Sequence, residues 1–447
     1  MIERQVISML PKWAGRVVIA ALLSMVHFTA PARAETDHGA AVQRLMASPM
    51  FQKAVEWLRG EQARIVEEAI QLQQIPAPNR REERKAQAFF DMLRAHGLSD
   101  VAIDSEGNVT GLRKGTGGSG MVAVVAHLDT VFPEGTDLTV RREGTLLRGP
   151  GLADNSHGLA VILALIRAMD AAGVSHREDI LFVGSVGEEG LGDLRGVKYL
   201  LTQGPYKGRI TTFIALDGTD PGEIVNAALG SKRYKVTFSG PGGHSYLAFG
   251  TVNPLYALAG AAQRIGAFEV PAGTTFNVGV VVGGTVVNAI PTEAVMQVDL
   301  RSVKPADLDA LEQRFLAAVE AAVAAENAAR STANGAILAK IERVGNRPSG
   351  ITSPESDLVA IATAAVAANG FKPRLSTSST DANMAIGLGI PAVTIASGIG
   401  GREHTLEEFL DIEPAAHLRQ IAMNLAVILA VAGAEDDAQV PAGGKVR

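Results

Sequence analysis

Short apolar runs rich in Val, Ile, Leu and Phe recur along the chain, and each is bounded by Gly, Asp or Pro. Their length and their flanks are typical of buried β-strands. Segments with apolar positions at helical spacing alternate with these runs. Such alternation predicts an α/β fold around a mostly parallel sheet. The predicted strands are 121–126, 180–186, 212–216 and 392–396. The predicted helices are 61–75 and 81–97, both expected at the surface, and 157–172 and 355–369.

Residues 230–345 follow a different pattern. The predicted elements come in the order βαββαβ, which is the split arrangement of a ferredoxin-like unit. This unit interrupts the first, so we predict an inserted α+β domain with hinges at 218–230 and 345–350. The first domain then has two parts, 35–229 and 346–435, followed by a frayed tail at 436–447. The predicted strands of the insert are 231–239, 275–282, 294–301 and 336–344, and its helices are 254–266 and 306–329.

Residues 1–34 have the pattern of a signal peptide. Three basic residues open the segment, residues 17–25 are apolar, and Ala32-Arg33-Ala34 matches the small-x-small pattern of a cleavage site. We therefore expect export to the periplasm or the medium, with cleavage near Ala34 and no stable membrane span afterwards. A membrane anchor is the alternative, but the apolar run is shorter than the ~20 residues that a spanning helix needs.

Composition narrows the chemistry. Apolar residues make up 47% and charged residues 20% of the chain, which is enough to bury a large core. The net charge is −6 and there is no basic stripe, so we expect no nucleic-acid partner. Because the chain has no cysteine, any metal site must be built from His, Asp and Glu.

Acidic and imidazole side chains follow the predicted strands. In open α/β sheets the carboxyl ends of the strands form one edge, where ligands bind. Residues far apart in the sequence are thus expected to converge there. They are His127 and Asp129 after 121–126, Asp154 before the helix 157–172, Glu188 and Glu189 after 180–186, Asp217 after 212–216, and His404 after 392–396.

Each of these residues also has a simpler interpretation. Asp154 alone is better explained as a helix N-cap, Asp217 as part of a turn, and the pair Glu188 and Glu189 as a solvated loop. Their shared position at one edge of the sheet favours a metal site over these simpler interpretations. Carboxylates crowded together repel one another unless a cation holds them. Two His and three carboxylates are too many ligands for one open zinc site. They suit two ions ~3.5–4 Å apart.

The strings HLDTVFPEG, GPGLADNSHGLA, GSVGEEGLGD, ALDGTD and EHTLEEF occur in this order. Together they resemble the dinuclear zinc exopeptidase and deacylase family, which includes glutamate carboxypeptidases, tripeptide aminopeptidases, succinyl-diaminopimelate desuccinylases and aminoacylases. The resemblance covers roughly residues 60–435. It implies a zinc-exopeptidase-like catalytic domain with an inserted lid or dimerisation domain, and two divalent ions, with zinc expected and cobalt or manganese as alternatives.

The resemblance also implies a role for each residue of the cluster. Asp154 bridges the two ions. His127 and Asp217 complete the ligands of one ion, and Glu189 and His404 those of the other. Two further residues have other roles: Asp129 accepts the spare N–H of His127, and Glu188 is the general base. His157 is a third histidine close to Asp154, but it begins a helix, so we assign it to packing or solvation.

Four residues of the insert and its second hinge match as well. The resemblance implies that His244 reaches across a dimer to the oxyanion and that Asn288 contacts the substrate. It also implies that Arg301 and Arg347 hold a substrate carboxylate through forked hydrogen bonds. Simpler interpretations remain for each arginine and for the histidine: a solvated turn for His244, a surface strand for Arg301 and a hinge for Arg347.

The expected function is therefore an exported metal-dependent exopeptidase that cleaves a terminal peptide bond of a small peptide, and that forms a homodimer through the insert. A deacylase acting on N-acyl amino acids is the alternative within the same chemistry. A non-catalytic metal- or ligand-binding periplasmic protein is the alternative of another class, which the unligated base Glu188 disfavours.

Overall fold

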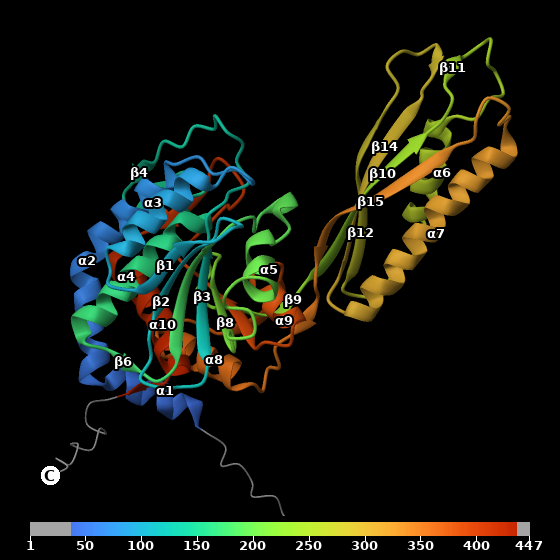
Figure 1. Ribbon diagram of the computed structural model, residues 1–447. Helices are drawn as coiled ribbons and strands as arrows, with labels where there is room; N and C mark the ends of the chain where they lie inside the picture. The colour runs from blue at the N-terminus through green and yellow to red at the C-terminus, as the bar shows by residue number, and fades with distance from the viewer. Residues whose placement is uncertain (1–36, 436–447) are drawn as a thin grey trace, which may run out of the picture. The chain divides into compact units, whose positions relative to one another are not determined.

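The computed structural model describes residues 37–435 (Figure 1). The predicted signal peptide 1–34 and the predicted tail 436–447 lie outside the described residues.

A nine-stranded sheet forms the centre of the larger part of the fold. All four strands predicted from apolar runs are confirmed, and they lie side by side as parallel neighbours. The strands β2 and β9 flank this parallel group in antiparallel orientation. The order is β1 (Ser99–Ile103), β2 (Val109–Arg113), β7 (Asp179–Ser185), β3 (Met121–His127), β8 (Thr212–Leu216), β18 (Ala392–Ile395), β9 (Glu223–Ala228) and β16 (Gly350–Ile351), with β17 (Arg374–Ser378) paired to β9.

Helices cover both faces of this sheet (Figure 1). Successive side chains of a strand point to opposite faces, so Val122 and Val124 of β3 enter one core, whereas Ala123 and Val125 enter the other. Because the strands are apolar on both faces, helices must cover both sides of the sheet to bury them. The first core is covered by α1 (His38–Ala47), α2 (Pro49–Gln73), α3 (Glu83–Arg94), α4 (His157–Ala172), α8 (Asp357–Ala368) and α10 (Pro414–Ala432), and the second by α5 (Arg195–Thr202) and α9 (Ala382–Gly387).

The helix α2 differs from its prediction. It begins at Pro49, twelve residues before the predicted start, and it packs against α4 rather than lying on the surface. Ser48 caps its first turn by accepting a hydrogen bond from the Phe51 N–H at 3.2 Å, and proline stands at the first helical position. Phe51 is fully packed in the core. The many charged residues within 61–75 made this segment resemble a surface helix, although one face of α2 is buried.

Two short sheets bring distant loops together. One of them joins segments on either side of the predicted site, because Leu410 of β20 pairs with Leu147 of β5. This pairing carries the loop that contains His404 to the loop that precedes α4. The first short sheet has the order β19 (Gly400–Gly401), β20 (Phe409–Asp411), β5 (Leu146–Arg148) and β4 (Arg141–Glu143), and the second pairs β6 (Ser175–His176) with β21 (Ala434–Glu435).

Among the described residues, two helices are long and apolar enough to cross a membrane, at 152–172 and 414–432. Their most apolar windows are 100% and 72% buried inside the fold, as in core helices.

The insert forms its own antiparallel sheet and core, and the predicted βαββαβ order is confirmed. The sheet order β12-β14-β10-β15 is that of a ferredoxin-like unit. The predicted hinge at 218–230 is wrong in part, because it contains β9 of the central sheet. The elements are β10 (Gly230–Ser239), β11 (Gly243–His244), α6 (Pro254–Gly266), β12 (Thr274–Gly283), β13 (Ala289–Ile290), β14 (Glu293–Ser302), α7 (Pro305–Ala329) and β15 (Leu338–Arg347).

Two histidines, one from α4 and one from α10, meet in the core. The Nε2 atoms of His157 and His417 lie 2.9 Å apart, and neither side chain is exposed. Burial lowers the pKa of His157 to about 3 and that of His417 to about 4. Both rings are therefore neutral in the fold, and one donates its N–H to the other. The expectation that His157 serves packing agrees with this position.

This pair predicts a loss of stability in acid. The unfolded chain binds protons at histidine below pH 6.5, whereas the folded chain resists protonation until about pH 4, so the free energy of unfolding falls as the pH decreases through this window. His417→Gln should remove up to about 3 kcal/mol of that fall. Urea unfolding at several pH values measures it, with the exposed His244→Gln as control. Parallel curves for wild type and His417→Gln would contradict the prediction.

Candidate functional site

The carboxyl ends of the parallel strands carry the predicted site residues. His127 is the last residue of β3, Glu188 and Glu189 follow β7, and Asp217 follows β8. Asp154 lies in the loop 152–156 immediately before α4, with extended dihedral angles (φ −119°, ψ 90°) that turn it out of the helix. The topology therefore brings these residues to one edge of the sheet, as predicted.

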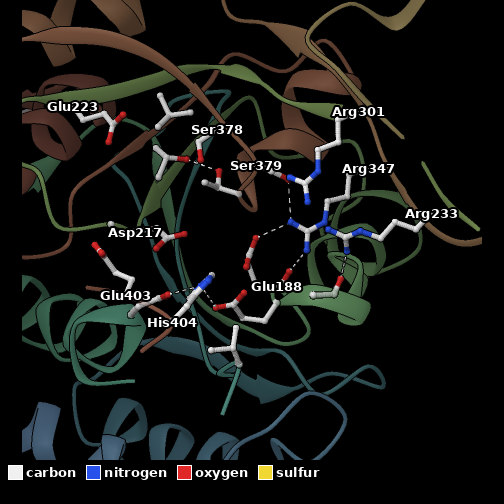
Figure 2. A pocket seen from close by; sticks show the side chains of 18 residues that line it. Glu188, Asp217, Glu223, Arg233, Arg301, Arg347, Ser378, Ser379, Glu403 and His404 are labelled. Atoms are coloured by element: carbon white, nitrogen blue, oxygen red, sulfur yellow. Dashed lines mark hydrogen bonds and ion pairs between the residues drawn. The ribbon is translucent and has the colours of Figure 1, made fainter. Parts of the chain in front are cut away.

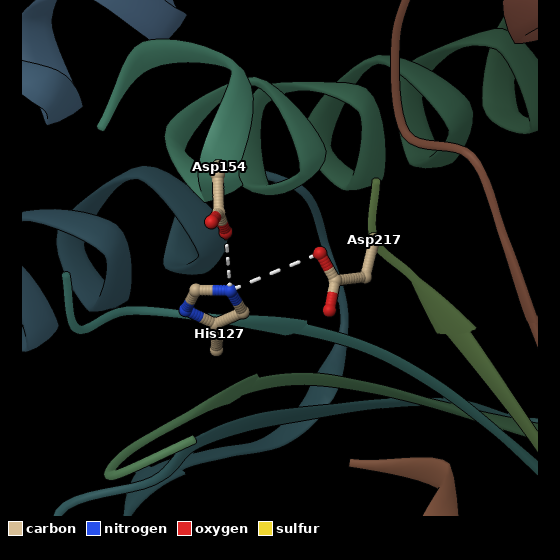
Figure 3. Close-up of side chains that lie close together, drawn as sticks. All are labelled: His127, Asp154 and Asp217. Atoms are coloured by element: carbon tan, nitrogen blue, oxygen red, sulfur yellow. Dashed lines mark hydrogen bonds and ion pairs between the residues drawn. The ribbon is translucent and has the colours of Figure 1, made fainter. Parts of the chain in front are cut away.

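The first group of side chains comprises His127, Asp154 and Asp217 (Figure 3). The His127 Nε2 atom lies 2.8 Å from Asp154 Oδ1 and 3.9 Å from Asp217 Oδ1. One ligand atom from each residue lies within 4.8 Å of the others. An imidazole nitrogen and two carboxylate oxygens at this spacing can hold one divalent ion.

The second group uses the other oxygen of the same aspartate. The His404 Nε2 atom lies 3.1 Å from Asp154 Oδ2 and 3.0 Å from Glu189 Oε1. His404 comes from the loop between β19 and β20, which the short sheet holds against the loop of Asp154. Asp154 thus belongs to both groups with one oxygen in each. Glu188 also lies within reach of His127 and Glu189, so its position alone is compatible with binding a metal or with standing beside it.

The electrostatics of the cluster fit metal ions. Burial raises the pKa of Asp217 to about 7, and burial also raises the pKa of Glu188 well above its ordinary value. Hydrogen bonds to Asp154 and Glu189 raise the pKa of His404 to about 11. Protons and cations thus compete for the same atoms, because these carboxylates need a positive charge to stay ionised. The set of two imidazoles and three carboxylates therefore fits two divalent ions.

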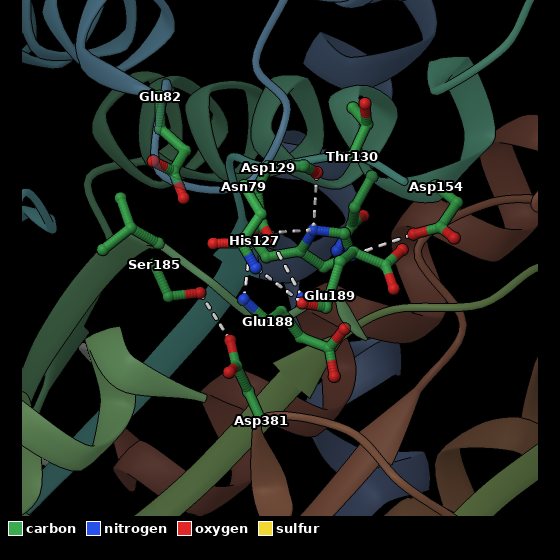
Figure 4. A network of polar contacts seen from close by, with 12 residues as sticks. Asn79, Glu82, His127, Asp129, Thr130, Asp154, Ser185, Glu188, Glu189 and Asp381 are labelled. Atoms are coloured by element: carbon green, nitrogen blue, oxygen red, sulfur yellow. Dashed lines mark hydrogen bonds and ion pairs between the residues drawn. The ribbon is translucent and has the colours of Figure 1, made fainter. Parts of the chain in front are cut away.

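Asp129 holds the loop that contains the two glutamates (Figure 4). Its carboxylate accepts the backbone N–H of Glu188 at 3.0 Å and that of Glu189 at 2.9 Å. The predicted contact with His127 is made by a different atom, since His127 Nδ1 lies 3.0 Å from the Asp129 backbone carbonyl and 3.7 Å from its carboxylate. The side chain of Asp129 therefore orients the glutamates, and its main chain orients the histidine.

A pocket of about 430 Å³ opens beside the metal-ligand groups (Figure 2). The predicted residues Arg301 and Arg347 line it, and so does Arg233, which the sequence analysis missed. Arg347 is buried and donates to Glu188 Oε1 at 3.2 Å, to Ser379 Oγ at 3.0 Å and to the Glu188 carbonyl. The strands of the insert thus contribute one wall of the pocket.

Asp299 fixes two of these arginines. Arg301 donates through Nε at 2.6 Å and Arg233 through Nε at 3.2 Å to its two carboxylate oxygens. Arg233 also donates to the Gly190 carbonyl, which follows the two glutamates. Within residues 37–435 the terminal nitrogens of Arg301 make no hydrogen bond, so they can meet an anion in the pocket.

His244 and Asn288 lie together at another part of the insert. The strands β11 and β13 pair there, and the Ser245 N–H donates to the Asn288 carbonyl at 3.0 Å. Both residues are exposed, and neither lines the pocket beside the metal-ligand groups. The predicted reach of His244 across a dimer to the oxyanion and the predicted contact of Asn288 with the substrate stay predictions.

A sequence profile of Peptidase family M20/M25/M40 matches residues 123–430. The chain belongs to this family. The protein YqjE of Bacillus subtilis (strain 168) is 29% identical over 377 residues, which are 78% of this chain and 94% of that protein. The resemblance found in the sequence motifs is thereby confirmed, and this M20 protein is a metallo-hydrolase, as predicted.

Solved structures of M20 proteins share the fold. The aminopeptidase PepT from Bacillus cereus ATCC 10987 has a TM-score of 0.67 at 24% identity and covers 83% of this chain and 99% of its own. The YXEP protein of Bacillus subtilis, described as a dinuclear metal binding peptidase from the M20 family, has a TM-score of 0.60 at 16% identity, with coverage of 83% and 99%. The predicted α/β fold with its insert is confirmed.

Glu408 is a second residue that the sequence analysis missed. Its buried carboxylate accepts the backbone N–H of Gly151 at 3.0 Å, that of Ala153 at 2.8 Å and that of Asp154 at 3.0 Å. These three bonds hold the loop that presents Asp154 to both ligand groups. The motif EHTLEEF contains this glutamate, but its neighbour Glu407 has the same charge, and only the structure separates them.

Glu408→Gln should weaken metal binding by about 10–100-fold, because an amide cannot accept all three N–H groups and the bridging aspartate loses its support. Calorimetric titration of the metal-free protein with zinc measures this affinity. The exposed neighbour Glu407→Gln is the matched control and should bind as the wild type does. Unchanged affinity in Glu408→Gln would show that the loop of Asp154 needs no such support.

Proposed function

We propose that this M20 hydrolase is a two-metal exopeptidase that cleaves a terminal amide bond of a small peptide. The observation that carries the proposal is that the two carboxylate oxygens of Asp154 face two separate groups of ligands. Five side chains in this arrangement suit two ions that share one carboxylate. Zinc fits the nitrogen and oxygen donors, and cobalt or manganese would fit them as well.

Glu188 is the proposed general base. Two bound ions would lower the pKa of a water between them and polarise the scissile carbonyl. Glu188 is buried at the edge of the ligand cluster, and it lines the pocket. This position supports Glu188 as the group that takes the proton of the attacking water and gives it to the leaving nitrogen. Glu189 faces His404 instead, which supports separate roles for the two neighbours.

The arginine wall supports a substrate with a free carboxylate. Arg301 has its terminal nitrogens available, and a guanidinium can hold a carboxylate with two parallel hydrogen bonds. A peptide with a free C-terminus and an N-acyl amino acid both offer such a group, so this wall alone is compatible with the exopeptidase and with the deacylase.

Glu188→Gln should keep both metal ions and lower kcat by about 10²–10⁴-fold, because the amide cannot accept a proton. Metal content is measured by elemental analysis, and turnover by hydrolysis of dipeptides, tripeptides and N-acyl amino acids with added zinc or cobalt. A chelator should abolish turnover of the wild type, and zinc or cobalt should restore it. Loss of metal from Glu188→Gln would instead make Glu188 a ligand, and unchanged turnover would remove it from the chemistry.

The edge of the inserted sheet supports a homodimer. The strand β12 is an edge strand, and Val280, Val281 and Val282 are 40%, 53% and 62% exposed. An apolar edge strand with unpaired backbone groups can pair with the same strand of a second copy. A dimer formed in this way would also give His244 a second chain to reach.

Val281→Lys should therefore shift the protein from dimer to monomer, because two copies of the charge would meet at the same edge. Light scattering coupled to size-exclusion chromatography measures the mass. Leu338→Lys on the opposite edge strand β15 is the control, since Leu338 is 67% exposed there. A wild-type protein that runs as a monomer would contradict the proposal.

Export is proposed from the sequence pattern of residues 1–34. The mature chain isolated from the producing cells should begin near Glu35, as read by N-terminal sequencing. A chain that retains the apolar run would favour the anchored alternative.

A further inference from the structure

Apart from the metal-ligand groups and Glu188, the charged residues that line the pocket lie on two sides of it (Figure 2). Arg233, Arg301 and Arg347 lie on one side, and Glu223 and Glu403 lie on the other, where Asp217 also lies. A ligand that fills the pocket therefore meets positive charge at one end and negative charge at the other. The proposed function accounts for the arginines but not for Glu223 or Glu403.

The position of Glu188 decides which part of a substrate faces each side. Its carboxylate contacts Arg347, so it lies between the ligand cluster and the arginine wall. A general base that protonates the leaving nitrogen must lie beside that nitrogen. The leaving part of the substrate is thus on the arginine side, and its carboxylate can reach Arg301. The acyl part then extends toward Glu223 and Glu403.

Glu223 is half-buried at the start of β9, where the rim of the pocket is formed. Its carboxylate has no hydrogen bond or ion pair with any of the described residues 37–435, whereas its backbone N–H is bonded to Asp220. Glu403 is also half-buried and accepts a hydrogen bond from the Thr219 hydroxyl, which fixes its direction. Uncharged residues such as Thr394 and Val225 also line the pocket.

We propose that Glu223 and Glu403 bind a free ammonium group on the acyl part of the substrate. The substrate class is then short peptides with both ends unblocked, and N-acyl amino acids are excluded. The physical reason is that an ammonium can pair with these carboxylates, whereas an acyl group would leave them facing an apolar chain in a confined pocket. The pocket volume of about 430 Å³ is in the range of small-molecule sites, which limits the peptide to a few residues.

This inference rests on the proposed function, because the direction of the substrate comes from the role of Glu188. It differs from that function in one respect, since a deacylase with the same metals and base would have no use for the two acidic residues. The two acidic residues therefore distinguish unblocked peptides from N-acyl amino acids, both of which have the carboxylate that the arginine wall can bind.

The test compares Gly–Leu and Ala–Ala with their N-acetyl forms, which keep the same free carboxylate. Binding is measured by calorimetry to the zinc-loaded Glu188→Gln variant, so that the readout is affinity rather than turnover. The unblocked dipeptides should bind at least about tenfold more tightly than the acetylated ones, the gain expected from one charge-assisted hydrogen bond. Glu223→Gln and Glu403→Gln, each added to Glu188→Gln, should reduce this preference, and the exposed Glu407→Gln should leave it intact.

Equal affinity for blocked and unblocked dipeptides would overturn the inference, and so would binding of neither pair. Turnover by the wild type separates this failure from a failure of the proposed function. Hydrolysis of the N-acetyl dipeptides at the same kcat/KM as the free ones would sink the inference and leave the two-metal hydrolase intact. Absence of any hydrolysis by the zinc-loaded wild type, with the binding preference present, would sink the proposed function and leave the ammonium site intact.

Discussion

The site depends on one shared carboxylate. Asp154 places one oxygen against His127 and the other against His404. A change in the position of this carboxylate would therefore disturb both groups of ligands. A carboxylate can face both partners only if its loop holds it at a fixed angle to them. The loop meets that demand by leaving the helical conformation at Asp154 just before α4 begins.

Backbone hydrogen bonds to buried carboxylates supply the rigidity. Glu408 accepts three N–H groups from the loop of Asp154, and Asp129 accepts the N–H groups of Glu188 and Glu189. In both cases an acidic side chain that belongs to neither group of metal ligands positions the main chain of residues in the ligand cluster. Charged acceptors make stronger hydrogen bonds than neutral ones, and the loss of either would leave buried donors unpaired.

The insert completes the pocket rather than merely interrupting the fold. The strand ends that carry Arg233, Arg301 and Arg347 form the positive wall, and the bond from Arg233 to the Gly190 carbonyl ties that wall to the segment after the two glutamates. The central sheet alone would offer metal ligands and acidic groups without the three arginines that line the pocket. The pocket is therefore lined by residues from both parts of the chain.

The sequence by itself determined the order of elements and the meeting of the acidic and imidazole groups. Apolar runs of strand length predicted the parallel strands, and residues that follow such strands must reach one edge, because parallel connections put all carboxyl ends together. The same reasoning worked for the βαββαβ insert, whose alternation is local. It failed where burial depends on contacts distant in the sequence. One face of α2 is buried although the helix has many charged residues, and the predicted hinge at 218–230 contains β9.

Only the tertiary structure decided which atom meets which partner. The sequence could not show that the carboxylate of Asp129 binds backbone N–H groups while its carbonyl meets His127, since both lie on one residue. It also could not distinguish Glu408 from Glu407, or place Arg233 and Glu223 on opposite sides of one pocket. Such contacts join residues far apart along the chain, and their directions are set by packing rather than by local pattern.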